Sequence, residues 1–199
     1  GGIVMSKKIE LKVLNVSSSL AQAHAYALVL QEVDGERRQL PVIIGPAEAQ
    51  AIAFSLKGFT PPRPFTHDLF VFFADAFQVE LQEVVIYKAQ EGVFYSYLYF
   101  EKDDIISRID SRTSDAVALA LRFGCPIYVT EDVLEAESIK LEDGGPVAVP
   151  ITTVNMDLLQ EALDKAVKEE NYELASQIRD EMRRREIGEL SPEDNILNL

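Results

Sequence analysis

Glycine and proline divide this chain near residue 145, and this break most limits how the chain can fold. Residues 138–155 contain the sequence Gly144-Gly-Pro146 and then Pro150, with no helical repeat of apolar residues. Such a composition is typical of a linker. For the 199 residues we therefore predict a first domain at 1–137, a linker at 138–155, a helical unit at 156–187 and a flexible tail at 188–199.

The first 137 residues combine short strand-like segments with helix-like ones. Alternation of apolar and polar residues predicts strands at 9–16, 23–31, 39–44, 83–88, 93–100, 105–110 and 126–130. Apolar residues at helical spacing predict helices at 46–57, 66–77 and 113–122, with a short helix at 132–136. This order predicts an α+β fold: a mixed, largely antiparallel sheet with packed helices.

The last predicted unit is an antiparallel helical hairpin. One apolar stripe begins at Leu158 and ends near Val167, and a second runs from Leu174 to Met182, with Glu170-Asn171 between them. Two helices of this length bury little apolar surface alone. We therefore expect their apolar faces to need the first domain, a second copy or a partner protein.

The charge of the chain limits its partners. It has 33 acidic and 19 basic residues, a formal net charge of −14 at pH 7. Such a charge repels nucleic acids at long range. The composition therefore argues against a general nucleic-acid-binding module.

Cellular location follows from what the sequence contains. No apolar run approaches the ~20 residues of a membrane-spanning helix, and no secretory signal pattern opens the chain. The single Cys125 cannot form an internal disulfide and precedes an apolar strand, which favours a buried thiol. We expect a soluble, cytoplasmic protein without membrane contact.

Polar side chains that can carry chemistry gather at the ends of the expected elements. Hydrolysis of a phosphodiester needs carboxylates to hold a divalent metal, a group that activates water and cations that neutralise phosphate. The sequence offers acids, a histidine and arginines for these roles. The metal ligands would be Glu48, Asp110 and Asp115, and the catalytic groups would be Arg63, His67, Asp68 and Arg112.

Each of these residues also has a structural interpretation. Asp68 and Asp115 fall in the first turn of an expected helix, where acids are common because of the helix dipole. Arg112 and Arg122 could pair with buried acids. Both interpretations stay open from the residues alone.

Three stretches, taken together, resemble the bifunctional nuclease family. They are Leu40-Pro-Val-Ile-Ile-Gly45 with Glu48, then Arg63-Pro-Phe-Thr-His-Asp-Leu69, and then the stretch from Ile109 to Arg122 followed by Pro126-Ile-Tyr-Val129. The resemblance covers about residues 7–137. It implies a mixed α/β fold, usually dimeric, with DNase and RNase activity reported for some members.

The resemblance also carries over a polar pattern. It adds Thr66 and Ser114 as substrate-binding residues and implies Mg²⁺ or Mn²⁺ as the metal. Thr113 is a departure, since the family usually has proline there; this changes a helix start and removes no catalytic group.

The segment from Leu158 to Arg185, with Tyr172-Glu-Leu-Ala-Ser-Gln-Ile-Arg-Asp-Glu-Met182, resembles the UVR motif of excinuclease B and C subunits. In those proteins the motif is a helical hairpin that binds another protein or its own copy. The resemblance implies a protein partner for residues 156–187. A plain helical extension that stabilises a dimer is the alternative.

Three functions remain open from the sequence. The first is a metal-assisted nuclease acting on DNA or RNA, working as a homodimer. The second is a non-catalytic adaptor that binds an anionic ligand and recruits a partner through the hairpin. The third is a small-molecule phosphoesterase, which needs the same residues in a closed pocket.

Overall fold

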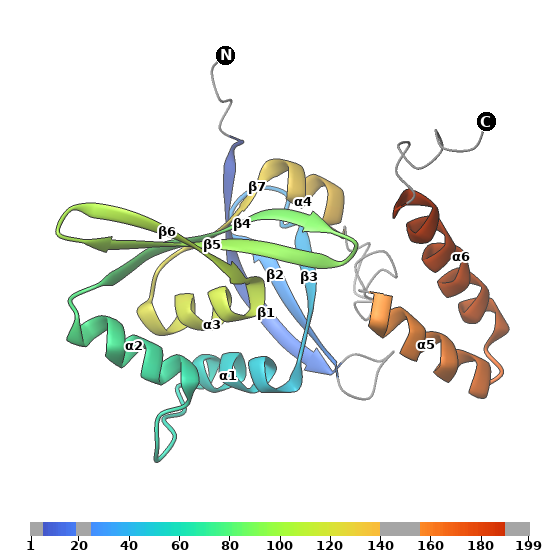
Figure 1. The fold of residues 1–199 in the computed structure, drawn as a ribbon, viewed down its shortest axis with the longest axis horizontal. Helices are drawn as coiled ribbons and strands as arrows, with labels where there is room; N and C mark the ends of the chain where they lie inside the picture. Colours follow the sequence, from blue (N-terminus) through green and yellow to red (C-terminus); the bar gives the residue numbers. More distant parts are fainter. Residues whose placement is uncertain (1–5, 19–24, 140–155, 190–199) are drawn as a thin grey trace, which may run out of the picture.

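Seven strands form one sheet in this computed structural model, which describes residues 6–18, 25–139 and 156–189 (Figure 1). Most of the expected linker and tail, residues 140–155 and 190–199, lie outside the described residues. Across the sheet the strand order is β3-β2-β1-β7-β4-β5-β6. The strands are β1 (Lys8–Ser18), β2 (Tyr26–Glu32), β3 (Gln39–Ile44), β4 (Glu80–Gln90), β5 (Val93–Lys102), β6 (Ile105–Arg112) and β7 (Ile127–Thr130).

The short strand β7 joins the two halves of the sheet. It pairs antiparallel with β1 and parallel with β4, whereas the other described pairs are antiparallel. The prediction of a mixed, largely antiparallel sheet with packed helices is therefore confirmed. Strand β6 forms one edge of the sheet, which becomes important for the site.

Helix α3 (Thr113–Phe123) is the centre of the first domain. It packs against β4, β5 and β6 on one side and against α1 (Pro46–Leu56) and α2 (Thr66–Ala76) on the other. Residues 116–118 are fully buried in the core. Asp115 in the first turn of α3 contacts His67 in the first turn of α2, so the beginnings of these two helices lie together.

The end of α3 is set by a glycine. Gly124 has φ of +69° at the C-cap, a left-handed conformation that a side chain would disfavour. The next residue, Cys125, is half-buried, and burial raises the pKa of its thiol to about 11. The thiol is therefore protonated at neutral pH. Helix α4 (Glu131–Glu137) follows β7 and buries Val133 and Leu134 in the same core.

Alternation along β5 separates two faces of the sheet. Phe94, Leu98 and Phe100 are buried on the helix side, while the intervening tyrosines are half-buried on the other face. The buried Ser96 hydroxyl is paired with the Thr113 hydroxyl at 2.6 Å, which joins the sheet to the first turn of α3. Phe94 and Phe100 therefore pack into the hydrophobic core.

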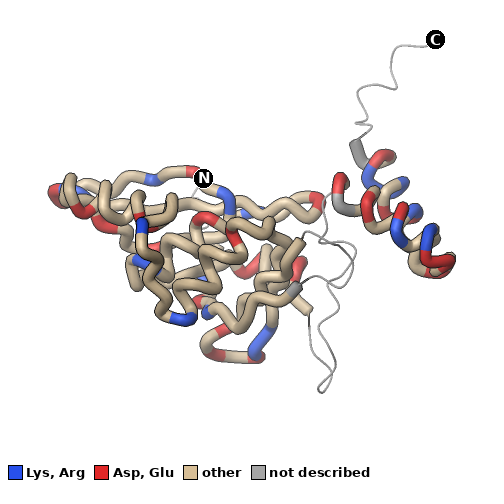
Figure 2. Tube along the Cα trace, turned by 90° about the horizontal axis from the view of Figure 1, so that it is seen from below, with Lys and Arg blue, Asp and Glu red and all other residues tan. Residues whose placement is uncertain are grey.

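The C-terminal helices α5 (Met156–Lys168) and α6 (Tyr172–Glu189) form the predicted antiparallel hairpin. Asn171 caps α6 by accepting a hydrogen bond from the Leu174 N–H at 3.2 Å. Acidic and basic residues alternate along both helices (Figure 2). The helix α6 extends to Glu189, past the expected end at 187. The buried hairpin core consists of Leu159, Ala162, Ala166, Ala175 and Ile178.

The hairpin touches the first domain through a buried arginine. Arg185 is 4% exposed, donates to the Glu91 carbonyl oxygen at 3.1 Å and pairs with Glu181 at 2.7 Å. Ile43 of β3 packs against the hairpin core. No helix in the described ranges is long and apolar enough to cross a membrane.

Candidate active site

A cavity of about 920 Å³ opens beside the edge strand β6, where the beginnings of α2 and α3 meet. The helix α1 and the loop before α2 close its other sides. It has a polar part and an apolar part. Its lining consists of Ala47, Glu48, Gln50, Ala51, Pro64, Phe65, Thr66, His67, Phe70, Leu98, Ile109, Asp110, Ser111, Arg112, Asp115 and Leu119.

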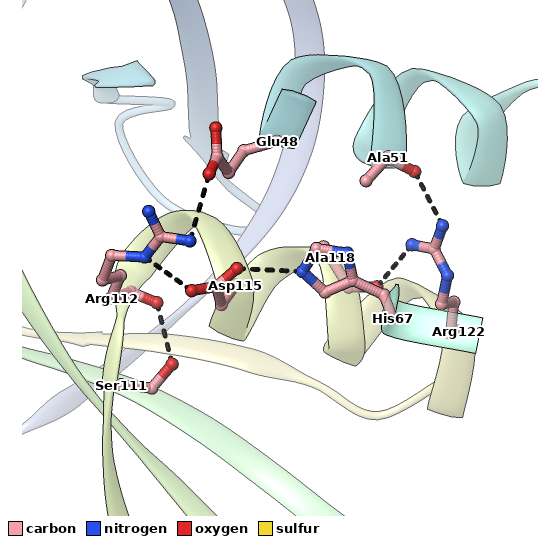
Figure 3. A network of polar contacts seen from close by, with 8 residues as sticks. All are labelled: Glu48, Ala51, His67, Ser111, Arg112, Asp115, Ala118 and Arg122. Carbon is pink, nitrogen blue, oxygen red and sulfur yellow. Dashed lines mark hydrogen bonds and ion pairs between the residues drawn. The ribbon is translucent and has the colours of Figure 1, made fainter. Parts of the chain in front are cut away.

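The polar part is built around a histidine–aspartate pair. His67 Nε2 lies 2.9 Å from Asp115 Oδ1 (Figure 3), and the His67 side chain is 15% exposed. Nδ1 makes no hydrogen bond with a described residue, so this ring nitrogen is available to another group. A carboxylate on one ring nitrogen fixes the tautomer and orients the ring, as in enzymes that use histidine to move protons.

Arg112 completes the cluster at the rim of the cavity. Its Nε donates to Asp115 Oδ2 at 2.7 Å, and its Nη2 lies 3.0 Å from Glu48 Oε1. The side chain is 67% exposed, so Nη1 remains free to meet an anion. Glu48 reaches this place because residue 45 is glycine: a Cβ there would lie 2.5 Å from Glu48 Oε2.

The two partners change the acidity of Asp115. The hydrogen bond from His67, assisted by Arg112, lowers the pKa of Asp115 to about 2 in spite of its partial burial. Asp115 therefore stays ionised at neutral pH and can stabilise a positive charge on His67.

The low pKa of Asp115 predicts an acid-sensitive contribution to stability. A depressed carboxyl pKa stabilises the folded chain above the ordinary value near 3.8, and this stabilisation is lost as the pH falls towards 2. We expect Asp115→Asn to lower the unfolding free energy by about 1–2 kcal/mol at pH 7, after discounting for exposure. Urea unfolding measures the difference in unfolding free energy between the wild type and Asp115→Asn. This difference should be about half as large at pH 3 as at pH 7. A free-energy difference that is the same at both pH values would contradict this prediction.

Asp68 points away from the cavity. Its Oδ2 accepts from the Phe65 N–H at 2.9 Å and its Oδ1 accepts from Arg122 Nε at 2.8 Å. Burial works to raise the pKa of Asp68, but these hydrogen bonds outweigh it and the pKa is lowered. The structural interpretation, that Arg122 pairs with a buried acid, fits this geometry.

The remaining candidates divide between the cavity and its surroundings. Asp110 lines the cavity and accepts a hydrogen bond from the Tyr87 hydroxyl at 3.1 Å. Thr66 also lines it. Arg63 and Ser114 are not among the lining residues; Arg63 lies exposed in the loop before α2, and Ser114 is buried in the first turn of α3. The structure therefore brings six of the nine together: Glu48, Thr66, His67, Asp110, Arg112 and Asp115.

The acids do not form a metal site as they stand. Among the described residues, no group of three or more His, Cys, Asp or Glu side chains is placed to hold a metal ion. Asp115 and Glu48 already pair with Arg112, and Asp68 pairs with Arg122. Binding of Mg²⁺ or Mn²⁺ therefore stays a prediction.

Sequence reasoning missed the apolar half of the cavity. Phe65, Phe70, Leu98 and Ile109 line it, from the loop before α2, from α2, from β5 and from β6. Phe65 and Ile109 lay inside stretches that carried the resemblance, but as apolar residues they were not taken as part of the site. Tyr87, which holds Asp110, was also missed because it comes from a strand two places away in the sheet.

A histidine held by an aspartate, beside an exposed arginine in a cavity, makes a site suited to moving a proton next to an anion. The model of the bifunctional nuclease domain matches residues 28–142, more than half of the chain, so the chain belongs to the bifunctional nuclease domain family. The model of the UvrB/uvrC motif matches residues 155–186, which covers the hairpin. Both resemblances are thus confirmed.

Known relatives include characterised and uncharacterised proteins. An uncharacterised protein of Mycobacterium tuberculosis is 45% identical over 116 residues, 58% of this chain and 68% of that protein. Bifunctional nuclease 1 of Oryza sativa subsp. japonica is 24% identical over 180 residues, 79% of this chain and 54% of that protein. Bifunctional nuclease 1 of Arabidopsis thaliana is 22% identical over 179 residues, 78% of this chain and 55% of that protein.

Proposed function

We propose that the first domain hydrolyses phosphodiester bonds of DNA or RNA at the cavity beside β6. The observation that carries the proposal is the 2.9 Å contact between His67 and Asp115, with Arg112 at the rim. Membership of the bifunctional nuclease domain family and the names of the plant relatives support it.

In this proposal His67 moves the proton. Its free ring nitrogen takes a proton from the attacking water while Asp115 stabilises the imidazolium. Arg112 binds the non-bridging phosphate oxygens through its free N–H groups. The water oxygen bonds to phosphorus, the P–O bond to the leaving sugar breaks, and the proton on His67 passes to the leaving oxygen.

Purified protein incubated with single- and double-stranded DNA and RNA tests the proposal. We expect Arg112→Met to lower kcat/KM by about 10- to 100-fold, because a hydrogen bond to a charged group contributes about 1.5–3 kcal/mol. Arg108→Met is the matched control: this exposed arginine of the same strand lies over the Tyr97 ring, outside the cavity lining. Equal activity in wild type and both variants would identify a contaminating nuclease.

The same assay decides the metal prediction. Activity lost in EDTA and restored by Mg²⁺ or Mn²⁺ supports the predicted metal, with a substrate phosphate as one of its ligands. Full activity in EDTA contradicts it and leaves the histidine–aspartate pair as the whole catalytic unit.

A non-catalytic adaptor is the second candidate, and the charges favour it. The net charge of −14 opposes binding of a polyanion, and Glu48, Asp68 and Asp115 are each already paired. An adaptor would bind an anionic ligand in the cavity without turnover. Saturable binding of a nucleotide or phosphate with no hydrolysis under any metal condition would favour it.

We propose that the hairpin binds a partner protein and that two copies of the chain associate. On the hairpin, Tyr172 and Ile187 are 68% and 64% exposed. On the first domain, exposed apolar side chains on α2 and the unpaired edge strand β6, among them Phe72 and Ile105, support a second copy as their cover. We expect the protein to act in the cytoplasm.

A further inference from the structure

The cavity has two halves of different chemistry. His67, Asp115, Arg112 and Glu48 form the polar half described above. The apolar half is contributed by four elements and the loop before α2. Its lining residues are Pro64, Phe65, Phe70, Leu98, Ile109 and Leu119.

Two phenylalanines are held in place beside the polar groups. Phe65 stacks on Phe54 with ring centroids 5.7 Å apart and an angle of 23° between the rings. Phe70 packs on Phe100 at 5.9 Å. Each nevertheless remains 39% exposed. Supported rings that keep an open surface lose little freedom when a flat ligand stacks on them.

The volume of the cavity and the chemistry of its lining fit one nucleotide. A base has two apolar faces, and its phosphate carries the negative charge that Arg112 can meet. The cavity volume of about 920 Å³ lies in the range of pockets that enclose small organic ligands. Gln50, also in the lining, offers an amide donor and acceptor for a base edge.

We infer that the cavity takes an unpaired base in its apolar half while the adjoining phosphodiester lies at Arg112 and His67, so that the substrate is single-stranded nucleic acid. This inference rests on the proposed function and names its substrate class. In a duplex each base is paired and stacked, and extracting it costs free energy. A single strand presents its bases without that cost.

Binding is tested with a fluorescent reporter. The chain has no tryptophan, so Phe70→Trp places a single indole in the apolar half, and stacking with a base quenches its fluorescence. His67→Gln in the same chain prevents turnover. We expect quenching by a ten-nucleotide single strand, but none by the same strand without bases or by a blunt duplex. Phe77→Trp is the control, because Phe77 is 54% exposed and lies at the far end of α2, outside the lining.

Measurements of nuclease activity provide a second test. We expect Phe65→Leu and Phe70→Leu to lower kcat/KM on single strands roughly tenfold, and Phe77→Leu to leave it unchanged. Phosphodiester cleavage that is equally fast on duplex and single strand, and unaffected by both leucine changes in the lining, overturns the inference but keeps the proposed function. Quenching without cleavage by the wild type supports binding of an unpaired base in the apolar half but overturns the proposed function. If the fluorescence falls as the protein concentration rises and does not depend on the oligonucleotide, a second copy of the chain covers the apolar half. This result would overturn the inference.

Discussion

His67→Gln should lower the rate of phosphodiester hydrolysis by about 10²- to 10⁴-fold, the range for loss of a general acid–base. Glutamine keeps a polar side chain of similar length, so the contact with Asp115 can persist while proton transfer at neutral pH is lost. The measurement is kcat on a labelled single-stranded oligonucleotide at saturating concentration. Because the change acts on the chemical step, KM should change far less than kcat.

The chain supplies its own control for this experiment. It has two histidines, and His24→Gln should retain the wild-type rate because His24 lies outside the three stretches that supply the candidate site residues. A His67→Gln rate within threefold of wild type would remove His67 from the chemistry. Circular dichroism on both variants excludes unfolding as the cause of a loss.

Arg122→Met should give the largest loss of stability, about 2–4 kcal/mol, because it breaks a mostly buried ion pair. Arg122 is 9% exposed and donates to Asp68 Oδ1 at 2.8 Å. It also donates to the Ala118 carbonyl at 3.0 Å and to the Ala51 carbonyl at 3.1 Å (Figure 3). It thereby ties α2 and α1 to α3. Methionine fills similar space but leaves one carboxylate and two carbonyl groups without this donor.

Urea unfolding followed by circular dichroism measures the effect of Arg122→Met. Arg63→Met, at an exposed loop position, is the control and should change the unfolding free energy by less than about 0.5 kcal/mol. The double variant Arg122→Met with Asp68→Leu should recover part of the loss, because no unpaired charge then remains. A loss below 0.5 kcal/mol for Arg122→Met alone would contradict the role given to this arginine.

The fold was largely predictable because its elements carry clear local signals. Alternation along β5 and the run of Ala, Val and Leu in α3 identify a strand with two faces and a buried helix without any tertiary information. The parallel pairing of β7 with β4 was not predictable, since the two strands are far apart in the sequence and periodicity does not encode neighbours.

The site was predictable only in part, for a geometric reason. His67 faces the cavity, whereas Asp68, about 100° further round the helix, is directed to Arg122. Likewise, the contact of Asp110 with Tyr87 depends on the order of β4, β5 and β6 in the sheet. The pairing of His67 with Asp115 was not predicted either, because it depends on how α2 packs against α3.

The hairpin, too, was predictable in its helices but not in its contact with the first domain. Its helices follow from two apolar stripes separated by Glu170-Asn171, and the structure places them as predicted. The docking of Arg185 on the Glu91 carbonyl was not foreseen, because the sequence around the β4–β5 turn offers only a backbone oxygen as the partner.

A double-mutant cycle on His67 and Asp115 tests most directly whether the two act as one unit. If Asp115 works by orienting His67, adding Asp115→Asn to His67→Gln should lower kcat by no more than about threefold further, although Asp115→Asn alone is strongly impaired. Losses that multiply, with the double variant slower by the product of the two single effects, would show that Asp115 acts independently of His67 and would contradict the account.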